Sequence, residues 1–299
     1  MSFLLLIALL IRAGPAAALP AQHAVVIKPV ANMHSAPTEN ADVVSQAIFG
    51  ANVGLLEEKE NWVKVRTPDE YAGWMPWSSL QILPAGAPLY ASAGHVALVE
   101  SLFANLYAEP DVTKHKPLLT VPFETRLEVA SEESGEDGQW IEVRLPAAPA
   151  RDVAVPDTLQ AWVQRGDVTF EPKPLAIQES IGFAKRFLGL PYLWGGTSSF
   201  GYDCSGFTQM LLRRRGIIMP RDADQQAAWN GLVAVARNKL KPGDLLFFGD
   251  SPDKITHTGM YIGKGRFIHD TVREHPMVQI SRLNDQPWGK LLVACRRVK

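Results

Sequence analysis

The first half of the chain contains a weak internal repeat, and a repeat restricts the architectures open to a chain. Three short segments occur twice in the same order: residues 31–37 and 104–110, 61–66 and 139–144, and 73–75 and 161–163. Short runs of alternating apolar and charged residues predict half-buried strands, and several such strands at short spacing predict a small β-barrel. We therefore expect two barrels, at residues 24–82 and 95–170, with Trp62 and Trp140 packed inside them.

The size of the chain allows a further domain, and its composition argues against a nucleic-acid partner and a disulfide-rich scaffold. The chain has 299 residues, which suits two or three domains, and its 46% of apolar residues can form ordinary cores. Its 30 basic and 31 acidic residues are mixed, without a basic stripe, so we expect no nucleic-acid partner. Two cysteines exclude a disulfide-rich scaffold. Nothing in the composition specifies an oligomeric state.

The N-terminus resembles a targeting segment. Residues 3–11 form an unbroken apolar run, which is shorter than the roughly 20 residues needed to span a bilayer. The run has the length of a signal-peptide core, and Ala16-Ala17-Ala18 offers a cleavage site, although no Lys or Arg precedes the run. We expect a leader over residues 1–23, export to the periplasm or cell envelope, and no stable membrane span. The alternative is a disordered leader or a misplaced start codon on a cytoplasmic protein.

The second half of the chain has a different pattern after the proline-bearing linker at residues 171–174. Apolar residues spaced by three and four predict a helix over 176–188, and a second helix is expected over 204–215. Strands are expected afterwards, at 245–248, 257–262, 266–271 and 291–295. Helices followed by strands indicate an α+β domain.

Cys204 is the residue with the clearest chemical potential. Two plain alternatives are a small buried hydrophobe and a disulfide with Cys295. Asp203 stands at an N-cap position, however, and a helix N-terminus lowers the pKa of a thiol while its free N–H groups can receive an oxyanion. We therefore expect Cys204 to be a nucleophile and Cys295 to belong to a core.

A cysteine nucleophile needs a base, and two of the seven histidines are suitably placed. If Gly263-Lys264-Gly265 forms a three-residue hairpin loop, Ile262 pairs with Arg266 and His269 lies opposite Gly259. His257 and His269 are then diagonal neighbours on one face of the hairpin. A loop of two residues would place them on opposite faces.

The sequence motifs of this half closely resemble those of the NlpC/P60 family of cell-wall cysteine peptidases. The matching stretches are Pro191-Tyr192-Leu193-Trp194-Gly195-Gly196, Asp203-Cys204-Ser205-Gly206-Phe207, Pro220-Arg221-Asp222, Lys241-Pro242-Gly243-Asp244-Leu245 and His257-Thr258-Gly259-Met260-Tyr261-Ile262-Gly263. The resemblance implies a papain-like α+β domain at 175–299, with Cys204 as nucleophile, His257 as base and His269 as the orienting residue. It implies no cofactor, and no cluster has the spacing of a metal site. The two barrels resemble bacterial SH3 domains.

A closer resemblance is to the subgroup that joins SH3 domains to this peptidase domain and cleaves γ-D-glutamyl–L-diamino acid bonds. It implies peptidoglycan stem peptides with a free N-terminal L-alanine as substrates, in the recycling of wall peptides. The residues that it places at the peptide site are Tyr192, Trp194, Asp203, Ser205 and Asp222. Asp203 would face the ammonium group, with a helix cap as its alternative role, and Tyr71 is a candidate from the first barrel.

Three other functions stay open at this point. They are a lytic endopeptidase of intact wall, an amidase or acyltransferase on the same scaffold, and a non-catalytic wall-binding protein.

Overall fold

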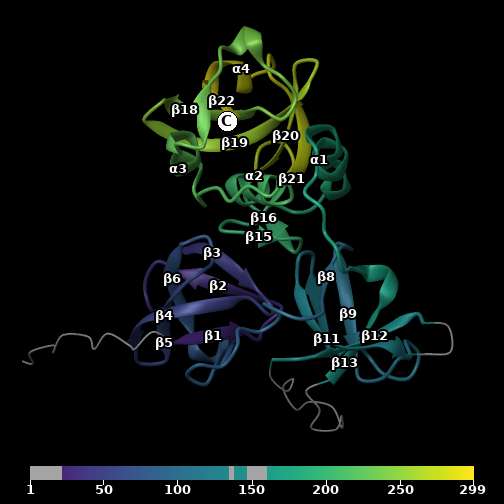
Figure 1. The fold of residues 1–299 in the computed structure, drawn as a ribbon. Helices are drawn as coiled ribbons and strands as arrows, with labels where there is room; N and C mark the ends of the chain where they lie inside the picture. The colour runs from purple at the N-terminus through teal and green to yellow at the C-terminus, as the bar shows by residue number, and fades with distance from the viewer. Residues whose placement is uncertain (1–21, 135–137, 147–159) are drawn as a thin grey trace, which may run out of the picture.

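The computed structural model describes residues 22–134, 138–146 and 160–299, arranged as three units (Figure 1). The leader expected at residues 1–23 lies outside the described residues, apart from its last two positions. Two β-rich units lie side by side, and the C-terminal unit stands above them. In the described part of the chain, every helix falls short of the length and apolar character that crossing a membrane requires.

The first unit is a curled seven-stranded sheet with the order β3-β2-β6-β5-β4-β1-β7. Its strands enclose an apolar core that includes Met33, Val63, Val65 and Met75. The strands are β1 (His23–Val26), β2 (Val30–His34), β3 (Val43–Ile48), β4 (Asn52–Lys59), β5 (Trp62–Arg66), β6 (Ala72–Pro76) and β7 (Leu80–Ile82), with the 3-10 turn η1 (Trp77–Ser79) before the last.

The second unit repeats this topology strand for strand. Its order is β10-β9-β13-β12-β11-β8-β14, which is the first order with seven added to each number. The three repeated segments of the sequence fall on β2 and β9, β5 and β12, and β6 and β13, so the internal repeat is confirmed. The elements are β8 (Val96–Val99), β9 (Phe103–Tyr107), β10 (Leu119–Pro122), β11 (Arg126–Ser134), β12 (Trp140–Arg144), β13 (Gln160–Gln164), η2 (Arg165–Asp167) and β14 (Val168–Thr169).

The two repeated tryptophans differ in burial. Trp140 is buried, as expected, with its ring edge-on to Tyr107. Trp62 is only half-buried, so the expectation that it joins the core is wrong. The reason is the two-residue period of β5, because Val63 and Val65 occupy the inward face and Trp62 must point the other way.

The segment between the two sheets fixes them to each other. Tyr90 is buried there, and its hydroxyl donates to the carbonyl of Arg144 at 2.6 Å. The backbone carbonyl of Tyr90 in turn accepts from Nδ2 of Asn52 at 2.9 Å. Gly50, at φ +77°, lies so close to the Tyr90 ring and to the carbonyl of Arg126 that a Cβ would collide with both. Residues of both sheets therefore meet at this point.

The C-terminal unit is an antiparallel six-stranded sheet with helices on both faces (Figure 1). Its order is β17-β22-β18-β19-β20-β21. The elements are α1 (Ile177–Ala184), η3 (Lys185–Phe187), β15 (Thr197–Ser198), β16 (Gly201–Tyr202), α2 (Cys204–Arg213), α3 (Ala223–Ala228), β17 (Leu232–Ala234), η4 (Arg237–Lys239), β18 (Leu245–Ser251), β19 (Lys254–Gly263), β20 (Arg266–Thr271), β21 (Met277–Arg282), α4 (Trp288–Leu291) and β22 (Leu292–Val298). The helices and strands expected in this half are all present.

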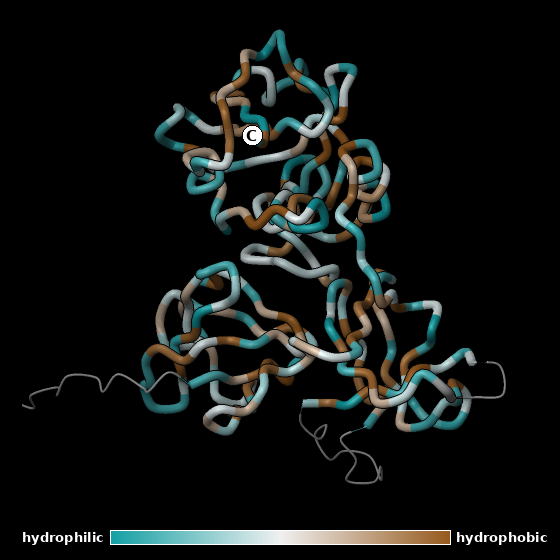
Figure 2. Tube along the Cα trace, viewed as in Figure 1, coloured by the Kyte–Doolittle hydropathy of each residue, from teal (hydrophilic) through white to brown (hydrophobic). Residues whose placement is uncertain are grey.

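Two apolar cores lie on opposite faces of this sheet. Helix α2 places Phe207, Met210 and Leu211 in the core on one face, together with Met260 and Ile268 of the sheet. The other face packs against α4, with Phe248, Phe267 and Trp288 in contact. Figure 2 shows hydrophobic segments within each unit and hydrophilic segments in the outer loops.

Both β-rich units contact the C-terminal unit. Gln46 of β3 accepts the N–H of Thr197 through its side chain at 3.2 Å. Phe123 of the second unit packs among Phe183 and Phe187, and Glu124 pairs with Arg213 at 2.6 Å. The last residue of α2 and the strand β15 are thus held from outside their own unit.

Candidate active site

Cys204 is the first residue of α2, as the sequence predicts, and it lies at a cavity of about 200 Å³. The helix begins here because Asp203 caps it, accepting the N–H of Gly206 at 2.7 Å. His257, Tyr192 and Trp194 line the same cavity. The thiol and one imidazole therefore face a common space.

The environment of the thiol opposes its ionisation. Burial raises the pKa of Cys204 to about 12, with a further contribution from the Asp203 carboxylate. The N–H groups of Thr258 and Ser205 lower the pKa, but they do not offset these effects. The N–H at the start of α2 therefore acts in the expected direction, but the expectation of a lowered pKa is wrong, because desolvation outweighs it.

Cys295 has no part in this site. Both cysteines are free, so the alternative of a disulfide between them does not apply. Cys295 lies on β22 in the core with Leu246 and Trp288, as the sequence predicts. Burial raises the pKa of this thiol too.

His257 and His269 lie on one face of the β19–β20 hairpin and contact each other. Nε2 of His257 is 2.8 Å from Nδ1 of His269. His269 lies opposite Gly259, since Met260 pairs with Ile268. The prediction that the two histidines share a face is confirmed. A Cβ on Gly259 would lie 2.9 Å from that of His269, so glycine leaves room for the contact.

The turn that joins the two strands differs from the expected one. Gly263, not Ile262, pairs with Arg266, and Lys264-Gly265 is a two-residue turn with positive φ at both positions. A register shift between Tyr261 and Gly263 inserts Ile262 as an extra residue. This bulge restores the register on which the histidine pair depends.

A third side chain continues the contact onto the next strand. Ser281 Oγ lies 3.0 Å from Nε2 of His269, and Ser281 sits opposite Phe267 on β21. His257, His269 and Ser281 are thus diagonal neighbours across β19, β20 and β21. The sequence analysis did not identify Ser281, because the turn before β21 contains no hairpin signal.

The two imidazoles are enclosed by aromatic rings. The Trp288 ring lies 5.0 Å from that of His257 and 4.7 Å from that of His269. Burial lowers the pKa of His257 to about 3, with a smaller contribution from Arg273. Burial also lowers the pKa of His269, and His257 adds to this effect. Both rings are therefore neutral at physiological pH.

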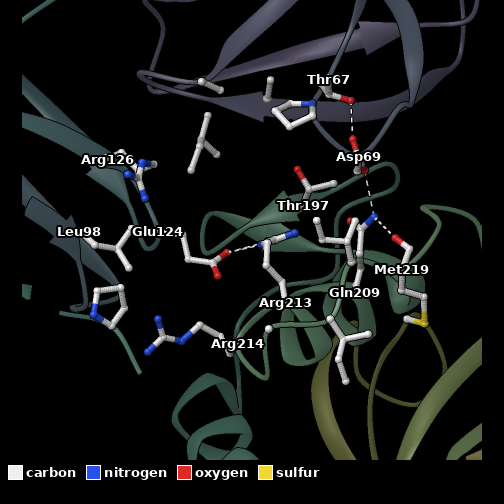
Figure 3. Close-up of a pocket in the computed structure, with 18 of the residues that line it drawn as sticks. Thr67, Asp69, Leu98, Glu124, Arg126, Thr197, Gln209, Arg213, Arg214 and Met219 are labelled. Atoms are coloured by element: carbon white, nitrogen blue, oxygen red, sulfur yellow. Dashed lines mark hydrogen bonds and ion pairs between the residues drawn. The ribbon is translucent and has the colours of Figure 1, made fainter. Parts of the chain in front are cut away.

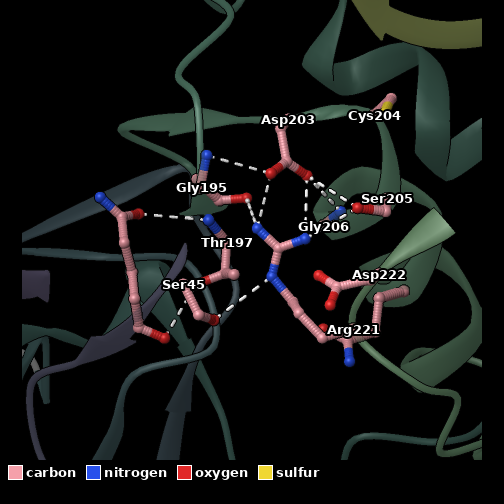
Figure 4. A network of polar contacts seen from close by, with 12 residues as sticks. Ser45, Gly195, Thr197, Asp203, Cys204, Ser205, Gly206, Arg221 and Asp222 are labelled. Carbon is pink, nitrogen blue, oxygen red and sulfur yellow. Dashed lines mark hydrogen bonds and ion pairs between the residues drawn. The ribbon is translucent and has the colours of Figure 1, made fainter. Parts of the chain in front are cut away.

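A buried ion pair fixes the loop before α2 (Figure 4). Asp203 and Arg221 form two hydrogen bonds, of 3.0 and 2.6 Å. The other donors to Asp203 are the N–H groups of Gly195 and Gly206 and the hydroxyl of Ser205. Five donors fill both oxygens of this carboxylate. The contacts correspond to its alternative role as a helix cap, and they leave little capacity for a substrate ammonium.

Arg221 extends this network to the first β-rich unit. Its guanidinium is 2% exposed and also donates to Ser205 Oγ at 2.8 Å. Its Nε donates to Ser45 Oγ of β3 at 3.2 Å. Ser205, expected to contact substrate, is buried within this network, and the set of residues that line the thiol cavity does not include it.

Of the remaining expected residues, Tyr192 and Trp194 line the cavity and Asp222 does not. Trp194 is 70% exposed at the cavity, and Tyr192 is half-buried there. Burial raises the pKa of Tyr192, with Cys204 as the next contributor. Asp222 receives the hydroxyl of Tyr71 from the first unit at 3.2 Å. Tyr71, the candidate from the first barrel, thus reaches the peptidase domain at Asp222, although it does not line the thiol cavity.

Comparison with known proteins decides the family. Residues 189–297 match the NlpC/P60 family, and residues 33–80 match the bacterial dipeptidyl-peptidase Sh3 domain. A γ-D-glutamyl-L-lysine dipeptidyl-peptidase of Bacillus cereus (strain ATCC 10987 / NRS 248) is 36% identical over 269 residues, which cover 85% of this chain and 74% of the relative. The chain belongs to the NlpC/P60 family. It is accordingly a hydrolase of the cysteine-peptidase type, with an SH3 domain before the NlpC/P60 domain.

A second relative and a solved structure are similar over most of their length. A γ-D-glutamyl-L-lysine dipeptidyl-peptidase of Bacillus subtilis (strain 168) is 31% identical over 271 residues, covering 87% of this chain and 82% of the relative. The crystal structure of an NlpC/P60 family protein from Bacillus cereus ATCC 10987 superposes with a TM-score of 0.75 at 30% identity, covering 92% of this chain and 99% of that one.

One buried acid of this NlpC/P60 chain has no evident partner. Asp270 follows His269 and points to the opposite face of β20, and neither carboxyl oxygen has a hydrogen-bond partner among the described residues. Burial raises its pKa to about 8, with Asp203 as the next contributor, while the N–H of Thr271 lowers it. The Thr271 N–H is near but does not complete a hydrogen bond. No sequence motif points to a role for this residue.

The chemistry available to this NlpC/P60 site is that of its own side chains. Within the described residues, no group of three or more His, Cys, Asp or Glu side chains is arranged to hold a metal ion. A thiol, an imidazole pair and a serine hydroxyl lie at or behind the cavity. Such a set is suited to acyl transfer.

Proposed function

We propose that this chain hydrolyses the γ-D-glutamyl–L-diamino acid bond of peptidoglycan stem peptides, with Cys204 as the nucleophile. The observation that carries the proposal is the cavity shared by Cys204 and His257, with His269 2.8 Å behind His257. The relatives named γ-D-glutamyl-L-lysine dipeptidyl-peptidase support the bond type.

The proton relay follows from the contacts of the rings. Nε2 of His257 is occupied by His269, so Nδ1 is the nitrogen left for the thiol. If Nδ1 accepts the thiol proton, Nε2–H of His257 donates to His269 Nδ1, and Nε2–H of His269 donates to Ser281. One N–H on each ring satisfies this chain of contacts, in agreement with two neutral imidazoles.

The reaction then proceeds by two acyl transfers. Because the thiol and His257 are both neutral, the proton moves to His257 as sulfur attacks the γ-carbonyl of D-glutamate. Backbone N–H groups at the start of α2 stabilise the oxyanion. The amine of the diamino acid leaves with the proton from His257. Water, deprotonated by His257, cleaves the thioester, and the sulfur regains the proton.

A free N-terminal L-alanine would be recognised between the first barrel and the NlpC/P60 domain. Tyr71 and Gln225 both donate to Oδ2 of Asp222, and among the described residues no side chain donates a hydrogen bond to Oδ1. Burial raises the pKa of Asp222, and an ammonium group would compensate its charge. We therefore assign the ammonium contact to Asp222 and keep Tyr192 and Trp194 at the peptide site, while Asp203 and Ser205 support the loop.

The wider organisation is part of the same proposal. The identical strand orders support a second SH3 domain at 95–170, after the first at 24–82. The cysteine helix packed on an antiparallel sheet that carries the histidines supports a papain-like α+β description for 175–299. Export and a role in recycling wall peptides complete the hypothesis.

Mass spectrometry of L-alanyl-γ-D-glutamyl-L-lysine, and of its diaminopimelate counterpart, tests the function. We expect release of L-alanyl-D-glutamate by the native chain and none by Cys204→Ala. N-acetylation of the alanine, or Asp222→Asn, should lower kcat/KM at least about tenfold, equivalent to ~1.4 kcal/mol. Cleavage of intact, glycan-linked wall without preference for free N-termini would favour a lytic endopeptidase instead. Transfer to an acceptor amine would favour an acyltransferase, and wall binding without cleavage would favour a binding protein.

A further inference from the structure

A second cavity, of about 490 Å³, lies where the three units meet (Figure 3). It shares no lining residue with the cavity of Cys204. Its walls come from β3 of the first barrel, β11 of the second, the linker at 172–174 and the end of α2. Sites for small ligands have volumes of ~300–1,000 Å³ and often occur between domains. The space is therefore large enough for a ligand of a few residues.

One side of this cavity is basic. Four cations line it, and two of them are neutralised, since Arg213 pairs with Glu124 and Arg214 with Glu100. The other two, Arg126 and Lys173, form no ion pair among the described residues. Nε of Arg126 donates to the carbonyl of Ala91 at 3.1 Å, which leaves its terminal nitrogens for a ligand.

The other side carries one acid. Asp69 accepts hydrogen bonds from Thr67 and from Gln209 Nε2, both of which are neutral donors. In the described structure no cation lies within ion-pair distance of this carboxylate, although Arg213 interacts with it from further away. Figure 3 shows Asp69 and Arg126 on opposite sides of the cavity, with the Glu124–Arg213 pair between them.

Apolar side chains complete the walls between the charged ends. Ile48, Ile218 and Met219 contribute to the lining together with Ala47 and Ala51. The charges without an ion-pair partner are two cations and one carboxylate, and they lie on opposite sides of the cavity, with the Glu124–Arg213 pair and these apolar side chains between them. A complementary molecule carries one ammonium group at one end and two carboxylates at the other.

We propose that this cavity binds short acidic peptides that have a free N-terminus, with the ammonium at Asp69 and the carboxylates at Arg126 and Lys173. Net attraction follows from the balance of charge, and the separation of the ends gives the peptide one direction. This inference rests on the charges of the cavity and does not depend on the proposed function. L-alanyl-D-glutamate has this charge pattern and is also the dipeptide that the proposed reaction would release.

The test is an NMR titration of the full-length Cys204→Ala protein with L-alanyl-D-glutamate. Saturable shifts are expected for the amide signals of Ala47, Ala51 and Gly216, which line this cavity and not the thiol cavity. The double variant Arg126→Gln/Lys173→Gln should weaken these shifts at least about tenfold. Arg144→Gln, which alters an exposed arginine paired with Glu128 in the same barrel, should leave them unchanged.

Two results would overturn the proposal. One is a set of shifts confined to residues of the thiol cavity. The other is binding that persists unchanged in the double variant or with an N-acetylated, doubly amidated peptide. Shifts at this cavity in a protein whose native form releases no dipeptide would support the second site and contradict the proposed function, so the two hypotheses fail separately.

Discussion

The hydroxyl of Ser281 lies 3.0 Å from Nε2 of His269, on the side of the ring away from His257. The imidazole that orients the base is therefore itself held from a third strand. A histidine whose two nitrogens are both engaged has a fixed tautomer and a fixed ring plane. The relay is thus a property of three paired strands and not of the hairpin alone.

Removing the Ser281 hydroxyl should weaken catalysis without altering binding. Ser281→Ala should lower kcat by about five- to tenfold, the equivalent of ~1 kcal/mol for one hydrogen bond, with KM unchanged. Ser281→Thr, which keeps a hydroxyl, should restore most of the rate. Steady-state kinetics on the lysine tripeptide measure both. An alanine variant as active as the native protein, alongside a strongly impaired His269→Ala, would show that the hydroxyl does not orient the ring.

The raised pKa of Cys204 predicts a specific pH dependence of alkylation. A thiol with a pKa of about 12 is protonated at neutral pH, so its rate of reaction with iodoacetamide should keep rising up to at least pH 10. Labelling for a series of fixed times, followed by peptide mass spectrometry, measures the labelling rates of Cys204 and Cys295 separately. A rate that levels off near pH 7 would instead reveal a preformed thiolate, and the mechanism would then begin from an ion pair.

Asp203→Asn should be far more damaging to stability than its small change in size suggests. Arg221 is 2% exposed, and loss of its carboxylate partner leaves a buried charge without compensation. Breaking such a pair costs about 3–5 kcal/mol. Urea unfolding should show this loss, with Asp222→Asn as the matched control at a carboxylate that accepts hydrogen bonds from Tyr71 and Gln225. Equal stability of the two variants would contradict the structural role of Asp203.

Asp270→Asn should stabilise the protein, and more so at high pH. The pKa of Asp270 rises from 3.8 to about 8 on folding, so its contribution to stability is present below pH 3.8 and is lost as pH rises towards 8. The gain from asparagine should therefore be larger at pH 8.5 than at pH 4.5 by up to about 5 kcal/mol, since each unit of pKa difference corresponds to ~1.4 kcal/mol. Urea unfolding at both values measures it, and the exposed Asp250→Asn is the control. A gain independent of pH would mean that the carboxyl is not neutral in the folded state.

Local patterns predicted the parts of the site that depend on local geometry. The side-chain period of two placed His257 and His269 on one face, and the N-cap rule placed Cys204 at the start of α2. The predicted hairpin turn was wrong in detail, yet the bulge at Ile262 kept the two histidines on the same face. These features involve residues within about a dozen positions of one another.

The features that the sequence did not predict depend on residues far apart in the chain. Asp203 caps a helix and also neutralises Arg221, and the second role appears only when the loop at 220–222 is brought to it. The pKa of Cys204 is set by how completely other elements cover it, which no nearby residue reveals. Tyr71 reaches Asp222 across 151 positions.

The bond between Ser45 and Arg221 joins residues 176 positions apart, one in the first barrel and one in the peptidase domain. Domains of modular proteins are often exchanged in evolution because each is complete by itself. Here the loop that presents the nucleophile is completed by a hydroxyl from another module. The strand β3 of the barrel thus supplies part of the support for this loop. Recombination that joins this barrel to an unrelated catalytic module would therefore remove the contact between Ser45 and Arg221, which neither domain can form alone.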